Sequence, residues 1–145
     1  MSPLQRLTVI LICLAAPACW ATESDVLGLW LSGDGDGWIE IRQQGEEFIG
    51  VIAGSPNNKP GDPPRLDDKN PDPALRDREL DGLAFMTGFK YAGDDRWTSG
   101  TIYDPNSGNT YKGTMRLVDR NTLKLRGYIG ISLFGRSDTW TRVED

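Results

Sequence analysis

Histidine and cysteine, the side chains that most often carry catalysis and bind metals, are scarce in this chain. The 145-residue sequence has no histidine, and its two cysteines, Cys13 and Cys19, lie in an N-terminal segment that we expect to be removed. Without histidine, a Ser-His-Asp site is impossible and the usual general base near neutral pH is missing. Zinc and copper would lack their preferred ligands. The sequence therefore predicts no metal, no cofactor and no enzymatic activity.

Carboxylates are the remaining groups that could do acid–base chemistry. Four aspartates in one loop-like segment could supply the acid and base of a glycoside hydrolase, namely Asp67, Asp68, Asp72 and Asp77. A solvated acidic loop is the favoured interpretation, because charged loops are ordinary on protein surfaces. A carboxylate-dependent hydrolase therefore stands only third among the functional hypotheses.

A second acidic stretch, Asp34-Gly35-Asp36-Gly37, begins like a calcium-binding loop. Its fifth position is Trp38, and Gly45 occupies the twelfth position, where a calcium loop needs glutamate. The stretch is therefore predicted to be a tight hairpin turn.

Aromatic and charged residues alternate along the last apolar segment in a way that favours a ligand pocket. If that segment is a strand, Arg136, Asp138 and Trp140 share one face. The same alternation aligns three further aromatic residues on earlier segments, Trp97, Tyr103 and Tyr111. We expect Arg136 to neutralise the polar end of a small amphipathic or anionic ligand between aromatic walls. A filled core, with these aromatic residues as packing, is an equally weighted alternative.

The elements that must position these residues are short β-strands. After Asp25, runs of β-branched and aromatic residues alternate with Gly, Asp and Asn turns, which is the spacing of hairpins. Eight strands are predicted, at Val26 to Leu31, Trp38 to Gln43, Glu47 to Ala53, Ala84 to Tyr91, Arg96 to Tyr103, Thr110 to Val118, Thr122 to Ile129 and Arg136 to Val143. Closure would remove the exposed edges of such a meander, so an eight-stranded antiparallel up-and-down barrel is favoured over a β-sandwich.

One segment, Ser55 to Gly82, breaks the hairpin rhythm and is called the long loop below. It holds six of the nine prolines, and a two-turn helix is predicted from Asp72 to Leu80, with Asp72 as N-cap and Pro73 at the first helical position. Leu75 and Leu80 would dock this helix, which makes an ordered lid more favourable than a disordered linker. The candidate lid residues are Asn70, Asp72, Arg76 and Arg78.

The first and last strands would be neighbours in a closed barrel. Arg142 could then lie over the ring of Trp30 in a cation–π contact that closes the barrel. Gly28-Leu29-Trp30 near the start of the domain, with a C-terminal arginine, resembles the lipocalin and avidin superfamily of ligand-binding barrels.

A longer set of motifs, in order along the chain, is more specific. These are Asn70-Pro71-Asp72-Pro73-Ala74-Leu75-Arg76, Gly100-Thr101-Ile102-Tyr103-Asp104-Pro105, Leu125-Arg126-Gly127-Tyr128-Ile129-Gly130, Phe134-Gly135-Arg136 and Trp140-Thr141-Arg142. Together they resemble the bacterial family called domain of unknown function 2147, from Val26 to Val143. The resemblance implies a lipocalin-like barrel in an exported bacterial protein, and it implies no established activity.

The N-terminal segment has the pattern of a cleavable signal peptide. Arg6 precedes a ten-residue apolar run from Leu7 to Ala16, which is too short to span a bilayer. We expect cleavage after Ala21, so that residues 1–21 are the signal peptide and residues 22–145 form a single barrel domain that is periplasmic or secreted. Lipid attachment at Cys19 is the less favoured alternative.

The overall charge narrows the range of partners. A net charge of −5 at pH 7 argues against nucleic acid and anionic membranes as partners. The favoured function is therefore an exported, non-enzymatic barrel that holds a small ligand beneath the long loop. The alternative is an interaction module in which the long loop binds another envelope protein.

Overall fold

The protein is an eight-stranded antiparallel barrel, as the sequence predicts. The structure is a computed structural model that describes residues 21–130 and 135–144. Its strands are β1 (Gly28–Leu31), β2 (Trp38–Gln44), β3 (Glu47–Gly54), β4 (Ala84–Gly93), β5 (Arg96–Asp104), β6 (Asn109–Asp119), β7 (Thr122–Tyr128) and β8 (Gly135–Arg142). All eight predicted strands are present, with boundaries that differ by two residues or fewer.

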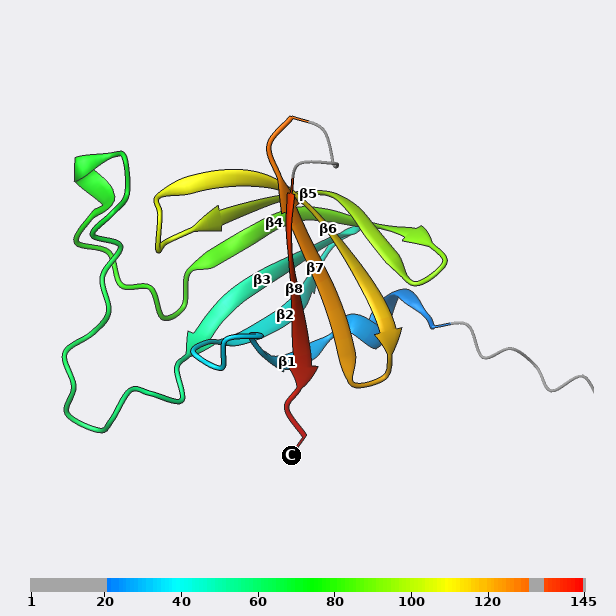
Figure 1. Ribbon diagram of the computed structural model, residues 1–145, viewed down its shortest axis with the longest axis horizontal. Coiled ribbons are helices and arrows are strands. Elements are labelled where there is room, and N and C mark those ends of the chain that lie inside the picture. The colour runs from blue at the N-terminus through cyan, green and yellow to red at the C-terminus, as the bar shows by residue number, and fades with distance from the viewer. Residues whose placement is uncertain (1–20, 131–134, 145) are drawn as a thin grey trace, which may run out of the picture.

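Each strand pairs with the next along the chain, and β8 returns to pair with β1 (Figure 1). The closing pair is short, with Trp30 opposite Arg142 and Leu31 opposite Thr141. The sandwich alternative is therefore wrong. Closure satisfies the backbone groups that two sheet edges would have left unpaired.

The two ends of the barrel differ in how their strands are connected. At one end the strands are joined by tight turns, and a 3-10 helix, η1 (Glu23–Val26), precedes β1 there. The turns Gly45 and Asp94-Asp95 at this end place residues at positive φ, which glycine and aspartate tolerate in hairpins. At the other end lie the β1–β2 turn, the long loop and the β5–β6 turn. We call these the closed end and the mouth.

Arg142 ties the closed end together. Its guanidinium lies 4.2 Å from the centre of the Trp30 ring and donates hydrogen bonds to the carbonyl oxygens of Asp25, Leu27 and Arg120. The Trp30 indole donates to the Val26 carbonyl at 2.9 Å. One side chain of β8 therefore holds η1, β1 and the β6–β7 turn in place.

Large side chains fill the closed half of the barrel. The core contains Trp30, Phe48, Phe89 and Trp97, all fully buried, together with aliphatic residues of β2, β6 and β7. Trp97 makes an edge-on contact with Phe48 at a ring separation of 6.1 Å and a tilted contact with Tyr91 at 5.1 Å. Burial of these rings supplies much of the apolar stabilisation of the fold.

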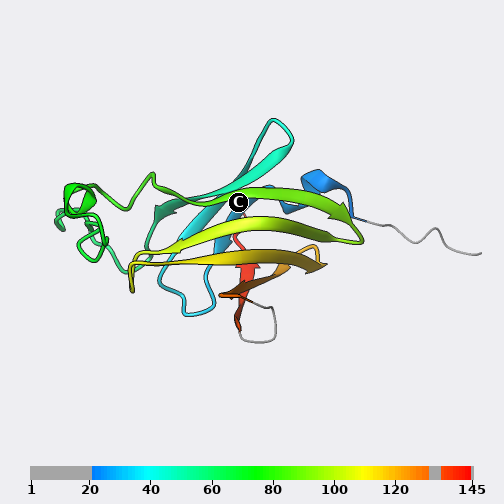
Figure 2. The same ribbon diagram turned by 90° about the horizontal axis from the view of Figure 1, so that it is seen from above.

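The long loop is ordered and projects from the mouth end of the barrel (Figures 1 and 2). Leu66 and Glu79 form an isolated antiparallel bridge, and the Leu80 amide donates to the Arg65 carbonyl. The two limbs of the loop therefore pair with each other, and the second limb also bonds to the barrel at its end, where the Gly82 amide donates to the Ile52 carbonyl of β3.

The helix of the long loop is shorter than the predicted two turns. Only η2, a 3-10 helix at Pro73–Leu75, forms; Asp72 is its N-cap and Pro73 opens it. Beyond Arg76 the chain turns back so that the Arg78 carbonyl can accept from the Asp67 amide. These tertiary hydrogen bonds replace the second helical turn, and Leu75 remains 37% exposed instead of docking.

Candidate functional site

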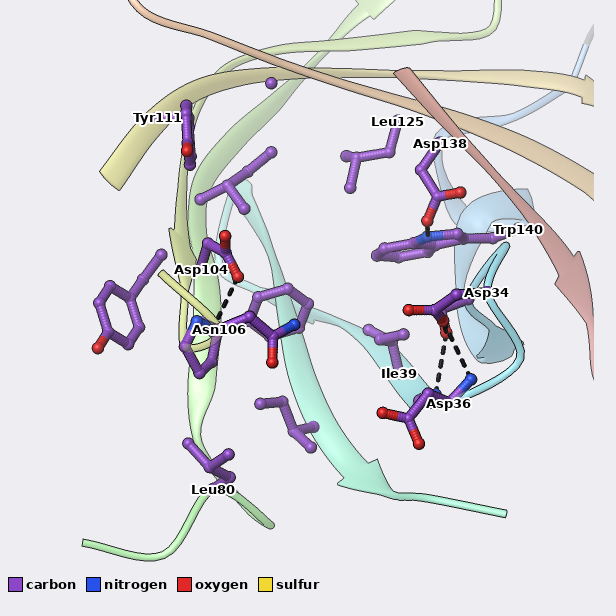
Figure 3. A pocket seen from close by; sticks show the side chains of 18 of the residues that line it. Asp34, Asp36, Ile39, Leu80, Asp104, Asn106, Tyr111, Leu125, Asp138 and Trp140 are labelled. Carbon is purple, nitrogen blue, oxygen red and sulfur yellow. Dashed lines mark hydrogen bonds between the residues drawn. The ribbon is translucent and has the colours of Figure 1, made fainter. Parts of the chain in front are cut away.

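The mouth of the barrel holds an open cavity of about 490 Å³, which we call the cup. It lies above the filled closed half and is drawn in Figure 3. Its apolar lining residues include Trp38, Ile39, Ile52, Leu80, Phe85, Ile102, Tyr111, Leu125 and Trp140, and its charged lining residues are Asp34, Asp36, Arg65, Asp104, Arg136 and Asp138. The barrel is therefore filled at its closed end and open at its mouth. The filled core and the ligand pocket, which the sequence left as alternatives, are both present, one at each end.

Phe89 and Ile102 separate the cup from the core. A Cβ atom on Gly100 would overlap the Phe89 ring, and one on Gly113 would lie 2.6 Å from Ile102 Cδ1 and 2.8 Å from Phe89 Cζ. The two glycines face each other on β5 and β6. They leave the space that the Phe89 ring fills, so the floor of the cup depends on the absence of side chains at these positions.

Strand β8 contributes three of the predicted site residues to the cup. Arg136, Asp138 and Trp140 all line it, and their partners on β7 are Gly127, Leu125 and Leu123. Asp138 Oδ2 accepts from the Trp140 indole at 2.7 Å and from the Gly33 amide at 3.3 Å. Asp138 thus fixes the Trp140 ring and links β8 to the β1–β2 turn where the strand pairing has ended.

The β1–β2 turn supplies two carboxylates that the sequence did not assign to a ligand site. Asp34 Oδ1 accepts from the Ser32 hydroxyl and from the Asp36 amide, while Asp36 Oδ1 accepts from Ser55 Oγ at 3.1 Å and Asn57 Nδ2 at 2.8 Å. The hydrogen bond from Ser32 is the main reason that the pKa of Asp34 lies below its usual value. The predicted hairpin turn is thus present, and it forms part of the rim of the cup.

Trp97, in contrast, is not a wall of the cup. It lies at the start of β5, near the closed end, and is fully buried in the core. Tyr103 is six residues further along the same strand, roughly 20 Å away at 3.3 Å per residue. The prediction that both line one pocket is therefore wrong, because alternation gives the face of a strand and not the position along the barrel.

Tyr103 lies at the rim on the opposite face of β5 from Ile102. A register shift between Trp97 and Gly100 adds a residue to β5, and Ser99 adopts φ 63° there. This bulge reverses the alternation, so Gly100 and Ile102 face inward with Gly113 and Tyr111 as their β6 partners. Tyr103 and Tyr111 both line the cup, and the Tyr103 hydroxyl donates to Asp67 of the long loop.

Asp67 is the centre of a buried polar cluster where the long loop meets the barrel. It accepts hydrogen bonds from the Tyr103 hydroxyl at 2.6 Å, Asn70 Nδ2 at 2.8 Å and Arg78 Nε at 2.8 Å. Burial raises the pKa of Asp67, but these hydrogen bonds outweigh burial and the pKa lies below its usual value. Burial, reinforced by Asp67, raises the pKa of Tyr103 to about 12.

The four predicted lid residues brace this cluster and do not line the cup. Asn70 and Arg78 bind Asp67 directly, Arg76 Nε donates to the Asn70 carbonyl at 2.8 Å, and the Asp72 amide donates to Asn70 Oδ1 at 2.9 Å. The long loop reaches the cup through two other residues, Arg65 and Leu80. The sequence pattern did not distinguish Arg65 and Leu80 from the neighbouring residues of the long loop.

The candidate hydrolase aspartates do not share a cleft. Asp67 is fully buried, whereas Asp68, Asp72 and Asp77 are exposed, and none of the four lines the cup. The expectation of a solvated acidic loop is therefore wrong for Asp67, which is the buried anchor of the loop. It holds for the other three.

The described residues, 21–130 and 135–144, were compared with the requirements of a metal site and of a membrane-spanning helix. Within these ranges, no three carboxylate, histidine or cysteine side chains gather as a metal site would require. The same residues contain no helix with the length and apolar character needed to cross a bilayer. The predicted signal peptide and Cys19 lie outside the described residues, apart from Ala21.

Comparison with known proteins identifies the family. Residues 28–142 match the family described as "Uncharacterized protein conserved in bacteria (DUF2147)", and no curated protein matches the chain. A solved structure from Helicobacter pylori, the protein HP1028, described as belonging to the lipocalin family, superposes with a TM-score of 0.74. It is 21% identical, over 82% of this chain and 83% of that one. The chain is thus a lipocalin-like barrel that belongs to the bacterial DUF2147 family.

Proposed function

We propose that this protein is a non-enzymatic carrier or sensor that binds one small amphipathic molecule in the cup. The observation that carries the proposal is the cavity of about 490 Å³, which is lined by apolar and aromatic side chains together with a few charged ones. Such an arrangement is typical of small-molecule sites, in which apolar walls provide affinity and a few polar groups orient the ligand. The lipocalin-like fold is consistent with this use.

The size of the cup and its open mouth suggest how a ligand is held. The apolar part of the molecule would lie against Phe85, Ile102 and Leu125, and its polar end would remain near the turns at the rim. Burying an alkyl chain of several carbons contributes about 0.8 kcal/mol per methylene group. A micromolar affinity, about −8.2 kcal/mol, therefore corresponds to burial of roughly eight to ten methylene groups together with one polar contact.

A variant in which a new side chain occupies the cup tests this proposal directly. Gly127 lines the cup, and a Cβ atom there would meet Tyr111 Cβ at 3.5 Å and Ile102 Cδ1 at 3.8 Å, which are ordinary contacts. Gly127→Leu should therefore place a side chain in the cavity without disturbing the walls, and Gly127→Ala is the matched control. We expect calorimetric titration with a neutral alkyl maltoside, below its micelle concentration, to show binding that Gly127→Leu weakens at least tenfold.

Two results would count against a ligand site. Absence of any heat or tryptophan fluorescence change with the wild-type protein would show that the cup does not accept an alkyl chain. Equal binding by Gly127→Leu and the wild type would place the bound molecule elsewhere. Native mass spectrometry of protein purified from its own host would then show whether a natural ligand travels with it.

A second candidate function uses the long loop as an interaction surface. Leu66 and Leu75 are 38% and 37% exposed on a segment that its own hydrogen bonds hold in shape. Exposed leucines on a rigid projection are suited to contact with another envelope protein. Leu66→Ser with Leu75→Ser should then abolish co-purification of that partner and leave ligand binding unchanged; unchanged co-purification would exclude this use of the two leucines.

We also propose that the protein acts after export, with Thr22 as the first residue of the mature chain. The signal-like sequence of residues 1–21 supports this site, with its apolar run followed by small residues and then by the acidic residues Glu23 and Asp25. Intact mass measurement of the exported protein should give the mass of residues 22–145. A mass that includes a diacylglycerol on Cys19 would contradict this proposal.

A further inference from the structure

The charged groups around the cup favour one sign of ligand charge. Four carboxylates line it, those of Asp34, Asp36, Asp104 and Asp138, against two guanidinium groups, those of Arg65 and Arg136. Arg65 is already paired, since its Nη2 lies 2.7 Å from Asp81 Oδ1. Arg136 is therefore the cation that remains to oppose four negative charges.

The negative charge of the rim is not neutralised by the protein itself. The groups that hold Asp34, Asp36 and Asp138 are uncharged donors: hydroxyls, an amide side chain, an indole and backbone amides. Among residues 21–130 and 135–144, no lysine or arginine forms an ion pair with these three carboxylates. Because only neutral donors hold these carboxylates, their hydrogen bonds add no positive charge at the mouth of the barrel.

Aromatic rings lie among these carboxylates. Trp140 lines the cup, its indole nitrogen donates to Asp138, and Figure 3 shows its ring between Asp138 and the turn that carries Asp34 and Asp36. The face of an indole ring attracts cations, and an ammonium between an aromatic face and a carboxylate is favoured by both. An anion entering the same region would meet like charges from the β1–β2 turn and from Asp138 of β8.

We propose that the cup selects an amphipathic cation, with an ammonium or similar positively charged group on an apolar body. This inference rests on the proposed function and names the ligand class for the same site. It replaces the expectation of an anionic ligand held by Arg136, because one guanidinium is outnumbered by the carboxylates around it. The net charge of the whole chain, −5, also attracts a cationic ligand as it approaches the protein.

Three amphiphiles with the same alkyl chain and different head groups test the inference. Calorimetry should rank an alkyltrimethylammonium above the alkyl maltoside and the alkyl sulfate last, at concentrations below micelle formation and with folding monitored by circular dichroism. We expect at least a fivefold preference for the ammonium over the maltoside at low salt. The preference should shrink as salt is added, because a rim charge is screened.

A charge-matched pair of double variants locates the effect. Asp34→Asn with Asp36→Asn keeps every hydrogen bond described above, since both aspartates accept only through Oδ1. This variant should bind the ammonium several-fold more weakly and the maltoside as before. Glu46→Gln with Glu47→Gln removes the same charge from the exposed β2–β3 turn at the closed end and should leave both affinities unchanged.

The outcomes separate the two proposals. If no amphiphile binds, or if Gly127→Leu leaves binding intact, both the proposed function and this inference are overturned. If the maltoside binds in the cup but the sulfate binds more tightly than the ammonium, only the charge selection is overturned. An equal loss of ammonium binding in the two double variants would also overturn it, because general charge and not the rim would then be responsible.

Discussion

At the scale of single residues, Asp67 has the largest structural consequence. It is a fully buried carboxylate that accepts from three side chains, one on the barrel and two in the long loop. An unpaired buried charge would be costly, whereas one that accepts this many hydrogen bonds is stabilised in its ionised form. The orientation of the long loop against β5 therefore depends on this one carboxylate.

Replacing Asp67 by Asn should destabilise the fold by about 1.5–3 kcal/mol, because it removes hydrogen bonds to a charged acceptor. Asp68→Asn, at the exposed neighbouring position, is the control and should change stability by less than about 0.5 kcal/mol. Urea unfolding measures both. A similar small effect of the two substitutions would mean that the cluster does not hold the loop.

The same cluster predicts how stability depends on pH at the alkaline end. The pKa of Tyr103 is raised to about 12 in the folded state, against about 10 in an unfolded chain. The stabilisation linked to this tyrosine is thus complete below pH 10 and is lost as pH rises toward 12. Ultraviolet titration should show a late tyrosine transition that Tyr103→Phe removes and that Asp67→Asn moves back toward pH 10.

At the scale of elements, the cup depends on how β4, β5 and β6 share space. Phe89 of β4 crosses over Gly100 and Gly113 of the next two strands, where it closes the floor. The bulge at Ser99 brings Gly100 to the inner face in register with Gly113. Strand packing and the bulge together therefore set the depth of the cup.

Gly100→Ala should destabilise the protein by about 1 to 3 kcal/mol, because the new methyl group would overlap the Phe89 ring. Phe89→Leu should cost less in the Gly100→Ala background than in the wild type, since the smaller side chain leaves room for the methyl group. Chemical denaturation of the four proteins gives this coupling. Additive effects of the two substitutions would show that the ring and the glycine do not share the space.

At the scale of the whole molecule, one arginine at the closed end completes the barrel. β1 and β8 share only two residue pairs, and the Arg142 guanidinium adds three carbonyl acceptors and the Trp30 ring to that short seam. Burial lowers the pKa of Arg142, yet the group remains charged throughout the range in which the protein folds. The seam between β1 and β8 is thus held by the contacts of this side chain as well as by strand pairing.

Arg142→Lys should therefore destabilise the fold by at least about 2 kcal/mol, because an ammonium cannot reproduce the planar fork that reaches three carbonyl groups. Arg120→Lys is the matched control, since the Arg120 side chain is exposed and only its carbonyl takes part. Urea unfolding compares the two. Full stability of Arg142→Lys would show that strand pairing alone closes the barrel.

Local patterns in the sequence were sufficient to predict the strands, their order and their closure into a barrel. Alternation of apolar and polar residues sets which side chains of β8 face inward, and tight turns require antiparallel neighbours, so Arg136, Asp138 and Trp140 were correctly grouped on one face. These are local properties of the chain, repeated at each hairpin. The family resemblance rests on the same segments.

The position of the cup along the barrel axis, in contrast, depends on contacts between residues that are distant in the chain. Trp97 was misplaced because periodicity gives no position along the barrel axis, and periodicity also does not predict the one-residue bulge that brings Gly100 and Ile102 of β5 to the inner face. Asp67, Asp36 and Asp138, likewise, differ from ordinary surface residues through partners that are distant in the chain, namely Tyr103 for Asp67, Ser55 and Asn57 for Asp36, and Gly33 for Asp138. Long-range contacts fix the depth, charge and floor of the cup, and short-range patterns do not encode them.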